Sequence, residues 1–237
     1  AITAKLSEQE IIAAIQAAIT EYPDIQLVVF SGGECFMLKD ALFNAIAFAT
    51  NLGRRTRCVT NAYWAKSISN AEKTAFRLTQ AGITEINIST GLDHQRWVPE
   101  NAIVNAVTAL HRAGIYTLVA VEKDTEDSGC LSSITCQPLI ARLLSSKDPL
   151  FRLVSNAWMP FHKDSNLREK IDQEELEKGC QQVFQNVVVT PHKQLSACCG
   201  LTFEHIPEMK LGSIDQIKNY RDQQQDDFLK LWLRVEG

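Results

Sequence analysis

The residues best suited to chemistry are Ser31-Gly32-Gly33-Glu34, which directly follow the apolar run Leu27–Phe30. An apolar run of this length is typical of a strand that is buried on both faces of a parallel sheet. Two glycines after it let a ligand come close to the backbone, and the Glu34 carboxylate can meet a cationic group such as an ammonium. Because ligands bind at the carboxyl ends of parallel strands, we expect a binding site at this turn.

Polar residues also lie at or just after the ends of the later apolar segments. Parallel strands bring their carboxyl ends to one edge, so a hydroxyl, carboxylate or amide there is well placed to bind a ligand. The alternative at each position is structural: a strand-end hydroxyl bonded to backbone, a solvated charge, a turn-shaping amide or a core tryptophan. The candidates are Asn61, Ser89, Arg96, Glu122, Asn156 and Trp158.

Alternating patterns predict the elements that position these residues. The expected strands are 27–30, 57–60, 85–90, 116–121 and 151–155. The expected helices are 7–22, 40–52, 69–80, 99–113 and 137–146. Short linkers between them favour parallel βα units. The three spaced glycines of a dinucleotide-binding fold are missing, so we prefer a partial (β/α)6 TIM-like barrel to an open Rossmann-like sheet, with its first strand upstream of Ala1.

The last part of the chain has a different pattern. Residues 187–190 and 195–199 predict a β-hairpin, and residues 212–225 predict a polar helix. The polar stretch 124–135 is expected to be a loop of the preceding α/β segment. We therefore predict an α/β barrel segment over 1–160 and a small hairpin-plus-helix extension over 161–237.

Composition narrows the classes of function. The 237 residues are 45% hydrophobic, which is enough for a sizeable core. A net charge of −4 gives no bulk support for a nucleic-acid partner. No apolar stretch reaches the roughly 18–20 residues of a membrane span, so we expect no membrane association. The seven cysteines form no compact disulfide pattern, which predicts reduced thiols and a cytoplasmic location.

Three segments together resemble the radical S-adenosylmethionine (radical SAM) enzymes. Ser31-Gly32-Gly33-Glu34 resembles the family's GGE motif. Arg57–Ala62 resembles its third strand with a Thr-Asn-Gly ending, although Ala62 stands where the family has glycine. Glu85–Ile115 resembles a subgroup in which a strand ending in Ser precedes Asp-His-Gln, Val-Pro and a helix. The resemblance extends from Ile11 to the C-terminus.

The family's cluster-binding motif is missing from the chain. It consists of three cysteines, separated by three and then two residues, and none of the seven cysteines here has that spacing. The family places it before the helix that leads into the GGE strand, so we expect the ligands of a 4Fe–4S cluster upstream of Ala1. On this interpretation the chain is a fragment, rather than a relative that lost the cluster.

The resemblance implies reductive cleavage of SAM to a 5′-deoxyadenosyl radical that takes a hydrogen atom from a substrate. In the family, the GGE turn receives the amino group of the cofactor's methionine, which implies this role for Gly32, Gly33 and Glu34. Contacts with the carboxylate, ribose or adenine of SAM, or with substrate, are implied for Ser89, Arg96, Glu122, Asn61 and Asn156.

The tail resembles the extension called SPASM or twitch. A Thr-Pro turn, a strand ending in cysteine, Leu-Gly and an acidic-polar helix follow in that order over 187–220. This implies Cys180, Cys198 and Cys199 as ligands of an auxiliary cluster. Neighbouring residues of a strand face opposite sides and such sites usually need four thiolates, so buried structural thiols are the favoured alternative. The extension also implies a peptide or small-protein substrate, and the chemistry implies an electron donor such as flavodoxin or ferredoxin.

Two other classes of function remain open. The chain can be a SAM- or peptide-binding module that lacks the cluster and does no radical chemistry. It can also be an unrelated α/β hydrolase or transferase, but it contains neither a nucleophile elbow nor a Walker phosphate loop. The substrate and the bond that is altered do not follow from the sequence.

Overall fold

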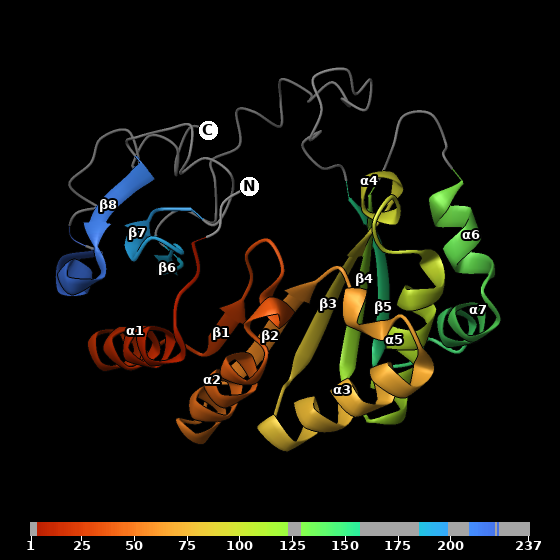
Figure 1. Cartoon of the computed structure of the whole chain (residues 1–237), viewed down its shortest axis with the longest axis horizontal. Coiled ribbons are helices and arrows are strands. Elements are labelled where there is room, and N and C mark those ends of the chain that lie inside the picture. The colour runs from red at the N-terminus through yellow and green to blue at the C-terminus, as the bar shows by residue number, and fades with distance from the viewer. Residues whose placement is uncertain (1–3, 123–128, 157–184, 199–208, 221, 223–237) are drawn as a thin grey trace. The chain divides into compact units, whose positions relative to one another are not determined.

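A computed structural model describes residues 4–122, 129–156, 185–198, 209–220 and 222, and the chain forms two compact units (Figure 1). One unit spans Gln26–Glu169, and the other combines Ala1–Ile25 with Lys170–Gly237. None of the helices in the described part is long and apolar enough to cross a membrane.

The unit 26–169 contains a five-stranded parallel sheet. Its strands run in the order of the sequence, so each one pairs with the strand that precedes it. They are β1 (Leu27–Phe30), β2 (Arg55–Thr60), β3 (Glu85–Thr90), β4 (Tyr116–Glu122) and β5 (Phe151–Asn156). The predicted α/β class with parallel strands is confirmed.

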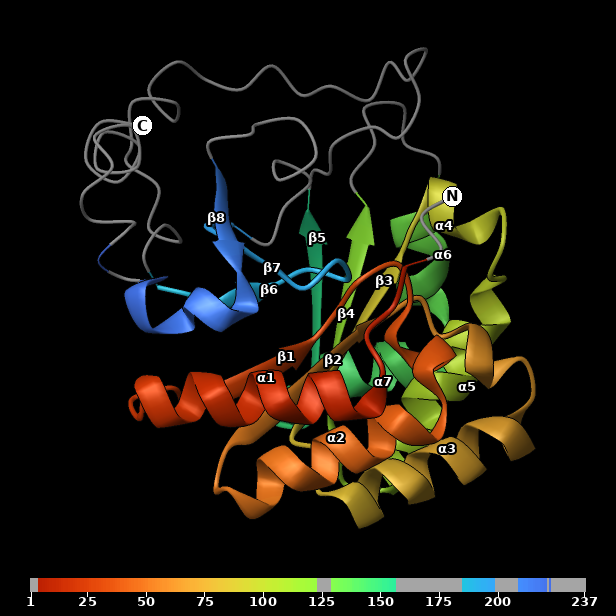
Figure 2. The same cartoon turned by 60° about the vertical axis from the view of Figure 1, so that its left-hand side comes forward.

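The helices between the strands pack side by side in chain order. They are α2 (Asp40–Asn51), α3 (Ile68–Ala81), α5 (Glu100–Arg112) and α7 (Pro138–Ser145). Each packs against the next, and α2, α3 and α5 lie along one face of the sheet (Figure 2). Their buried side chains include Ile46, Leu78, Ile103 and Leu110, and the strands contribute the buried Ile86, Ile88 and Val119. Apolar burial of this kind contributes about 25 cal/mol per Å² and holds the layers together.

Two predictions for this unit were wrong. The expected loop 124–135 includes part of α6 (Cys130–Cys136), whose Cys130 and Ile134 are buried. The strand at 27–30 was expected to be buried on both faces, but Val29 of β1 is 45% exposed. Among the described strands β1 is at the end of the order, which explains why it is less covered than β3 or β4.

A hydrogen bond between Asp148 and His111 holds the turn that leads into β5. The carboxylate of Asp148 lies 3.1 Å from Nε2 of His111 on α5 and accepts a hydrogen bond from the backbone N–H of Leu150 at 2.9 Å. The Leu150 N–H, followed by His111, lowers the pKa of Asp148 from its ordinary value of 3.8.

We expect Asp148→Asn to lower the thermal midpoint at neutral pH. A carboxylate with a depressed pKa stabilises the fold above its unfolded-state value, and this contribution is lost as the pH falls through the folded-state value. The difference between wild type and variant should therefore shrink once the pH drops below about 3.8. Thermal unfolding followed by circular dichroism across that range checks this, and a difference that does not change with pH would contradict it.

The second unit combines the first helix with the tail strands. Helix α1 (Glu8–Glu21) begins at a capping box, in which Ser7 and Glu10 exchange hydrogen bonds. The antiparallel sheet contains β6 (Val188–Val189), β7 (Gln194–Ser196) and β8 (Lys210–Ser213). The structure thus contains the predicted hairpin and adds a third strand. The expected helix from residue 212 was wrong at its start, because Gly212 and Ser213 belong to β8 and the 3-10 helix η4 follows over Ile214–Asn219.

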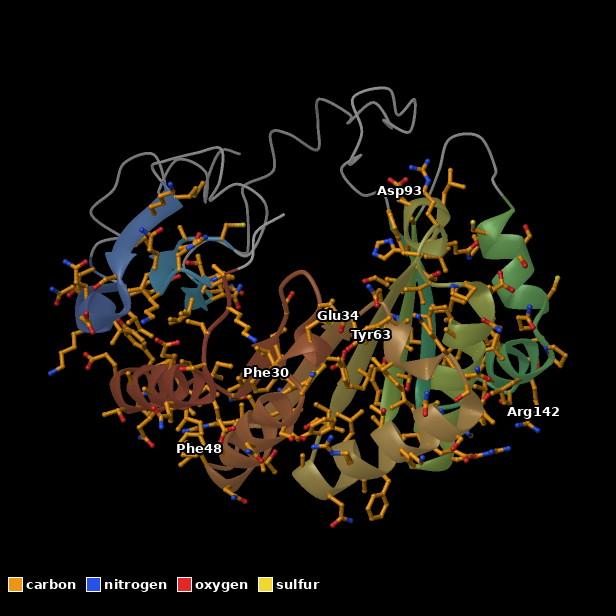
Figure 3. The ribbon with its side chains drawn as sticks, viewed as in Figure 1. Phe30, Glu34, Phe48, Tyr63, Asp93 and Arg142 are labelled. Atoms are coloured by element: carbon orange, nitrogen blue, oxygen red, sulfur yellow. The ribbon has the colours of Figure 1, made fainter. Side chains whose placement is uncertain are left out.

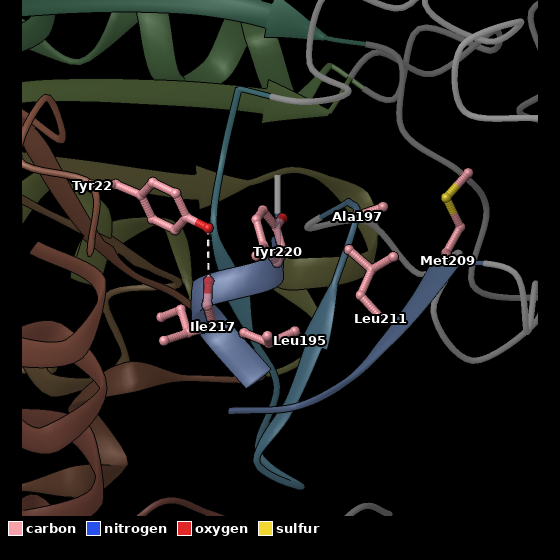
Figure 4. Packing of buried hydrophobic residues seen from close by; sticks show 7 residues of the cluster. All are labelled: Tyr22, Leu195, Ala197, Met209, Leu211, Ile217 and Tyr220. Carbon is pink, nitrogen blue, oxygen red and sulfur yellow. Dashed lines mark hydrogen bonds between the residues drawn. The ribbon is translucent and has the colours of Figure 1, made fainter. Parts of the chain in front are cut away.

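A small apolar core holds this unit together (Figure 4). The Tyr22 hydroxyl at the end of α1 donates to the carbonyl of Ile217 at 2.7 Å, and its ring meets the ring of Tyr220 edge to face. The buried members are Tyr22, Leu195, Ala197, Met209, Leu211, Ile217 and Tyr220. Helix α1 therefore packs within the same unit as the tail, and the predicted division at residue 160 stays a prediction.

Candidate functional site

The carboxyl ends of the parallel strands form one edge, and the polar turns of the chain follow them. Figure 3 shows Glu34, Tyr63 and Asp93 at this edge of the unit 26–169. Two groups of contacts lie along it. The Glu34 cluster joins the turns after β1 and β2, and contains Glu34, Phe36, Thr60, Asn61 and Trp64. The Glu122 cluster joins the ends of β3 and β4, and contains Gly91, Asp93, Arg96 and Glu122.

Glu34 connects two turns that are 26 residues apart in the chain. Its Oε1 accepts hydrogen bonds from the Thr60 hydroxyl at 2.8 Å and from the Phe36 N–H at 3.1 Å. Its Oε2 accepts from the Asn61 N–H at 2.9 Å. The carboxylate therefore holds the exposed Gly32-Gly33 turn against the end of β2.

Thr60 and Trp64 complete this cluster. The Thr60 oxygen accepts from the Ala62 N–H at 3.0 Å and from Trp64 Nε1 at 3.2 Å. The Trp64 ring stacks on Phe36 with ring centroids 5.1 Å apart. The backbone of Ala62 is left-handed at φ 62°, a conformation that favours glycine. Sequence reasoning did not identify Thr60 or Trp64 as partners of Glu34.

Asn61 has a structural task at this turn. Its side-chain oxygen accepts a hydrogen bond from the N–H of Tyr63 at 3.0 Å, which is the local pattern of an Asx turn. Its own N–H is taken by Glu34. The turn-shaping alternative therefore has direct support, while a contact with cofactor or substrate stays a prediction.

Gly33 is the position where the fold leaves most freedom. Its φ lies outside the positive region, and a Cβ added to it would meet nothing within 4 Å. Gly32 also has open space but has φ +132°, which side chains rarely adopt. The positive φ of the turn therefore explains the glycine at position 32. At position 33 nothing in the described residues requires glycine.

Glu122 is almost fully buried at the end of β4, with 4% of its surface exposed. Its Oε2 accepts from the Asp93 N–H at 3.2 Å, and the Asp93 carboxylate pairs with Arg96 at 3.3 Å. Gly91 lies directly against it, since an added Cβ would be 2.3 Å from the Cβ of Glu122. Sequence reasoning proposed Glu122 and Arg96 but missed Gly91 and this link through Asp93.

Ser89 and Asn156 lie at the same edge, on the two strands that flank β4. Ser89, on β3, is 8% exposed and pairs in register with Ala120 of β4. Asn156 is the last residue of β5 and the register partner of Glu122, although its side chain and the whole of Trp158 lie outside the described residues. The backbone thus brings all five predicted strand ends to one edge.

Burial shifts the titration of three groups at this edge. It raises the pKa of Glu34, against the hydrogen bonds from Asn61, Thr60 and Phe36 that stabilise the carboxylate. It also raises the pKa of Tyr63, with the nearby Glu34 charge as the second cause. It lowers the pKa of His94, which Asp93 partly opposes. All three shifts favour the neutral form of the group.

The structure describes only one of the three predicted tail ligands. Cys198 is half-buried after β7, whereas Cys180 and Cys199 lie outside the described residues. Among the residues whose placement is described, no group of three or more His, Cys, Asp or Glu side chains is arranged to hold a metal ion. An auxiliary cluster at these cysteines therefore stays a prediction.

Comparison with known proteins adds no assignment to this geometry. No protein-family model and no curated protein matches the chain. A functional proposal therefore depends on the motifs of the sequence and on the contacts at the carboxyl edge.

Proposed function

We propose that this chain is part of a radical SAM enzyme and that the carboxyl edge of its parallel sheet binds SAM. On this proposal the sheet is a segment of a (β/α) barrel. The sequential strand order supports it, because a doubly wound Rossmann-like sheet reverses its order at a switch point. Helices packed in chain order along one face are the corresponding feature of a singly wound sheet.

The observation that carries the proposal is the exposed Gly32-Gly33 turn after β1. The open space at Gly33 suits the close approach of a ligand to the backbone. Glu34 fixes this turn through its bonds to β2, so the ligand meets a preformed surface. From β1 to β4 the edge spans three strand spacings, or about 14 Å, which suits a ligand the size of an adenosylated amino acid.

The remaining roles follow from position along the edge. The backbone of Gly32 and Gly33, with the charge of Glu34 behind it, would receive the ammonium of SAM. Arg96, half-exposed and paired with Asp93, would receive its carboxylate. Ser89 and Glu122, at the ends of β3 and β4, would face the ribose.

The cofactors supply the hard chemistry of such an enzyme. When bound beside a reduced 4Fe–4S cluster, SAM supplies a radical that abstracts hydrogen from a substrate, here a peptide or small protein. The described cysteines form no three-thiolate set for that cluster, so no step is assigned to them. The task of this chain is to orient SAM and to exclude water from it.

We expect Gly33→Val to lower SAM affinity at least tenfold while leaving the fold intact. Valine would put side-chain bulk where the cofactor approaches, and nothing described lies within 4 Å to clash with a Cβ there. Gly33→Ala is the matched control, with a smaller loss of affinity and an unchanged thermal midpoint. Calorimetric titration of the full native protein, loaded with its cluster, measures this. Equal affinity of wild type and folded Gly33→Val protein would remove the assignment.

The competing proposal is a SAM- or peptide-binding module without radical chemistry. It is distinguished by whether the native reading frame continues upstream into the three-cysteine motif. It is also distinguished by adding SAM and dithionite under anaerobic conditions and measuring 5′-deoxyadenosine. Binding without that product would favour the module over the enzyme.

A further inference from the structure

Two buried thiols lie behind the Gly32-Gly33 turn. Cys58 is on β2 and fully buried, on the strand face that it shares with Thr56 and Thr60. Cys35 begins the 3-10 helix η1 (Cys35–Leu38) and is 2% exposed. Both are free cysteines. Both thiols are therefore separated from solvent.

The backbone brings these two residues together. Phe30, the last residue of β1, is the register partner of Cys58, and the turn 31–34 returns the chain onto β2. The Cys35 thiol donates to the carbonyl of Val59 at 3.3 Å, which places its sulfur beside the strand next to Cys58. The Cys58 thiol is also the largest cause of the raised pKa of Cys35. The two free cysteines thus lie on adjacent segments, as a disulfide between them requires.

We propose that Cys35 and Cys58 form a reversible disulfide, which makes the turn that precedes η1 sensitive to peroxide. One thiolate attacks hydrogen peroxide, breaks its O–O bond and becomes a sulfenic acid, and the released hydroxide takes up a proton to give water. The second thiolate then attacks the sulfenic sulfur, and the sulfur–sulfur bond forms as a second water leaves. The two thiols lose two electrons and two protons, and one peroxide is reduced to two waters. An external dithiol reverses the reaction.

The surroundings make this reaction slow in the closed structure. The neighbouring Cys58 thiol and burial raise the pKa of Cys35, and the charge of Glu34 acts in the same direction. A protonated thiol is a poor nucleophile, so the reaction waits for a local opening. Ser31, Gly32 and Gly33 are exposed and immediately precede the pair, and they are the segment whose opening admits peroxide.

Oxidation would act on the Glu34 cluster. A sulfur–sulfur bond is shorter than a contact between two thiols, so the start of η1 must move toward β2. Glu34 is the residue before Cys35, and its carboxylate holds Thr60 and the Asn61 N–H on the same strand end. The disulfide should therefore change the protection of the Asn61 and Phe36 amide protons. This inference does not depend on SAM binding.

The experiment oxidises the native chain after its accessible thiols have been blocked. Cys136 is exposed and is capped first with N-ethylmaleimide, and hydrogen peroxide follows. The protein is then denatured, alkylated and cut with trypsin, which places Cys35 in peptide 6–39 and Cys58 in peptide 58–66. Mass spectrometry should find these two peptides linked, with the link removed by dithiothreitol. Amide exchange at Asn61 and Phe36 is compared before and after oxidation.

Cys35→Ala and Cys58→Ala should each abolish the link. If either variant fails to fold, formation of the linked peptides in the wild-type protein and their separation by dithiothreitol still decide the question. If peroxide oxidises other residues of the chain but Cys35 and Cys58 are both recovered as unlinked, alkylated peptides, the proposal is overturned. Linkage of Cys35 or Cys58 to a different cysteine would also overturn it. A 35–58 link with unchanged amide exchange would contradict the coupling to Glu34.

Discussion

Replacing Gly91 with alanine is expected to destabilise the unit 26–169 by about 4 kcal/mol. Its φ is +140°, and an added Cβ would lie 2.3 Å from the Cβ and 3.0 Å from the backbone nitrogen of Glu122. The neighbouring atoms belong to the backbone and base of a buried side chain at the end of β4, which cannot move aside. Urea unfolding followed by circular dichroism measures the loss.

Gly114→Ala is the matched control for this prediction. Gly114 also has a positive φ, at +72°, but a Cβ there would meet nothing within 4 Å. Its variant therefore reports the backbone strain alone, which costs about 1–2 kcal/mol. Equal losses in the two variants would show that contact with Glu122 contributes nothing and would remove Gly91 from the Glu122 cluster.

The strands could be predicted from the sequence because local pattern and tertiary role agree there. Leu27–Phe30 and Glu85–Thr90 have the predicted bounds, and both are followed closely by glycine or a polar turn. In β3 the alternation of Glu85, Ile86, Asn87 and Ile88 matches the burial of the two isoleucines. A pattern of period two that is also the pattern of burial leaves little ambiguity.

The missed elements depend on contacts that the local sequence does not contain. Helix α6 is rich in serine and threonine, which compete for backbone hydrogen bonds, yet burial of Cys130 and Ile134 stabilises it. The strand Lys210–Ser213 pairs with Gln194–Ser196, more than ten residues earlier. The sequence predicts a helix from Gly212 onward instead, since pairing across a long connection leaves no local signal.

In the candidate site, too, some features could be predicted from the local sequence and others depend on tertiary contacts. The sequence predicted Glu34 from its place after two glycines, and the structure places it at the expected edge. Its three donors come from Thr60, Asn61 and Phe36, and two of them lie on a different strand end. Residue type and spacing identify Glu34 as a carboxylate that can bind a ligand. Only the fold shows that its oxygens already accept hydrogen bonds from the protein.

Glu34→Ala is the second large expected effect. The substitution leaves the Thr60 hydroxyl and the N–H groups of Asn61 and Phe36 without their acceptor. Removing one partner from a buried donor costs about 1–3 kcal/mol, so we expect a loss of about 3 kcal/mol in all. Glu72→Ala is the control, because Glu72 makes an exposed ion pair with Arg112 and such pairs contribute about 0–1 kcal/mol.

Glu34→Gln distinguishes the hydrogen bonds from simple packing. Glutamine keeps the size of the side chain, and its oxygen can still accept from the Asn61 N–H. Its amide nitrogen then faces the Thr60 oxygen, which already accepts from Ala62 and Trp64, and the Phe36 N–H loses its partner. The loss should therefore lie between those of Glu34→Ala and Glu72→Ala in urea unfolding. If Glu34→Ala costs no more than Glu72→Ala, the three bonds do not hold the turn, and the preformed surface on which the SAM proposal depends is lost with them.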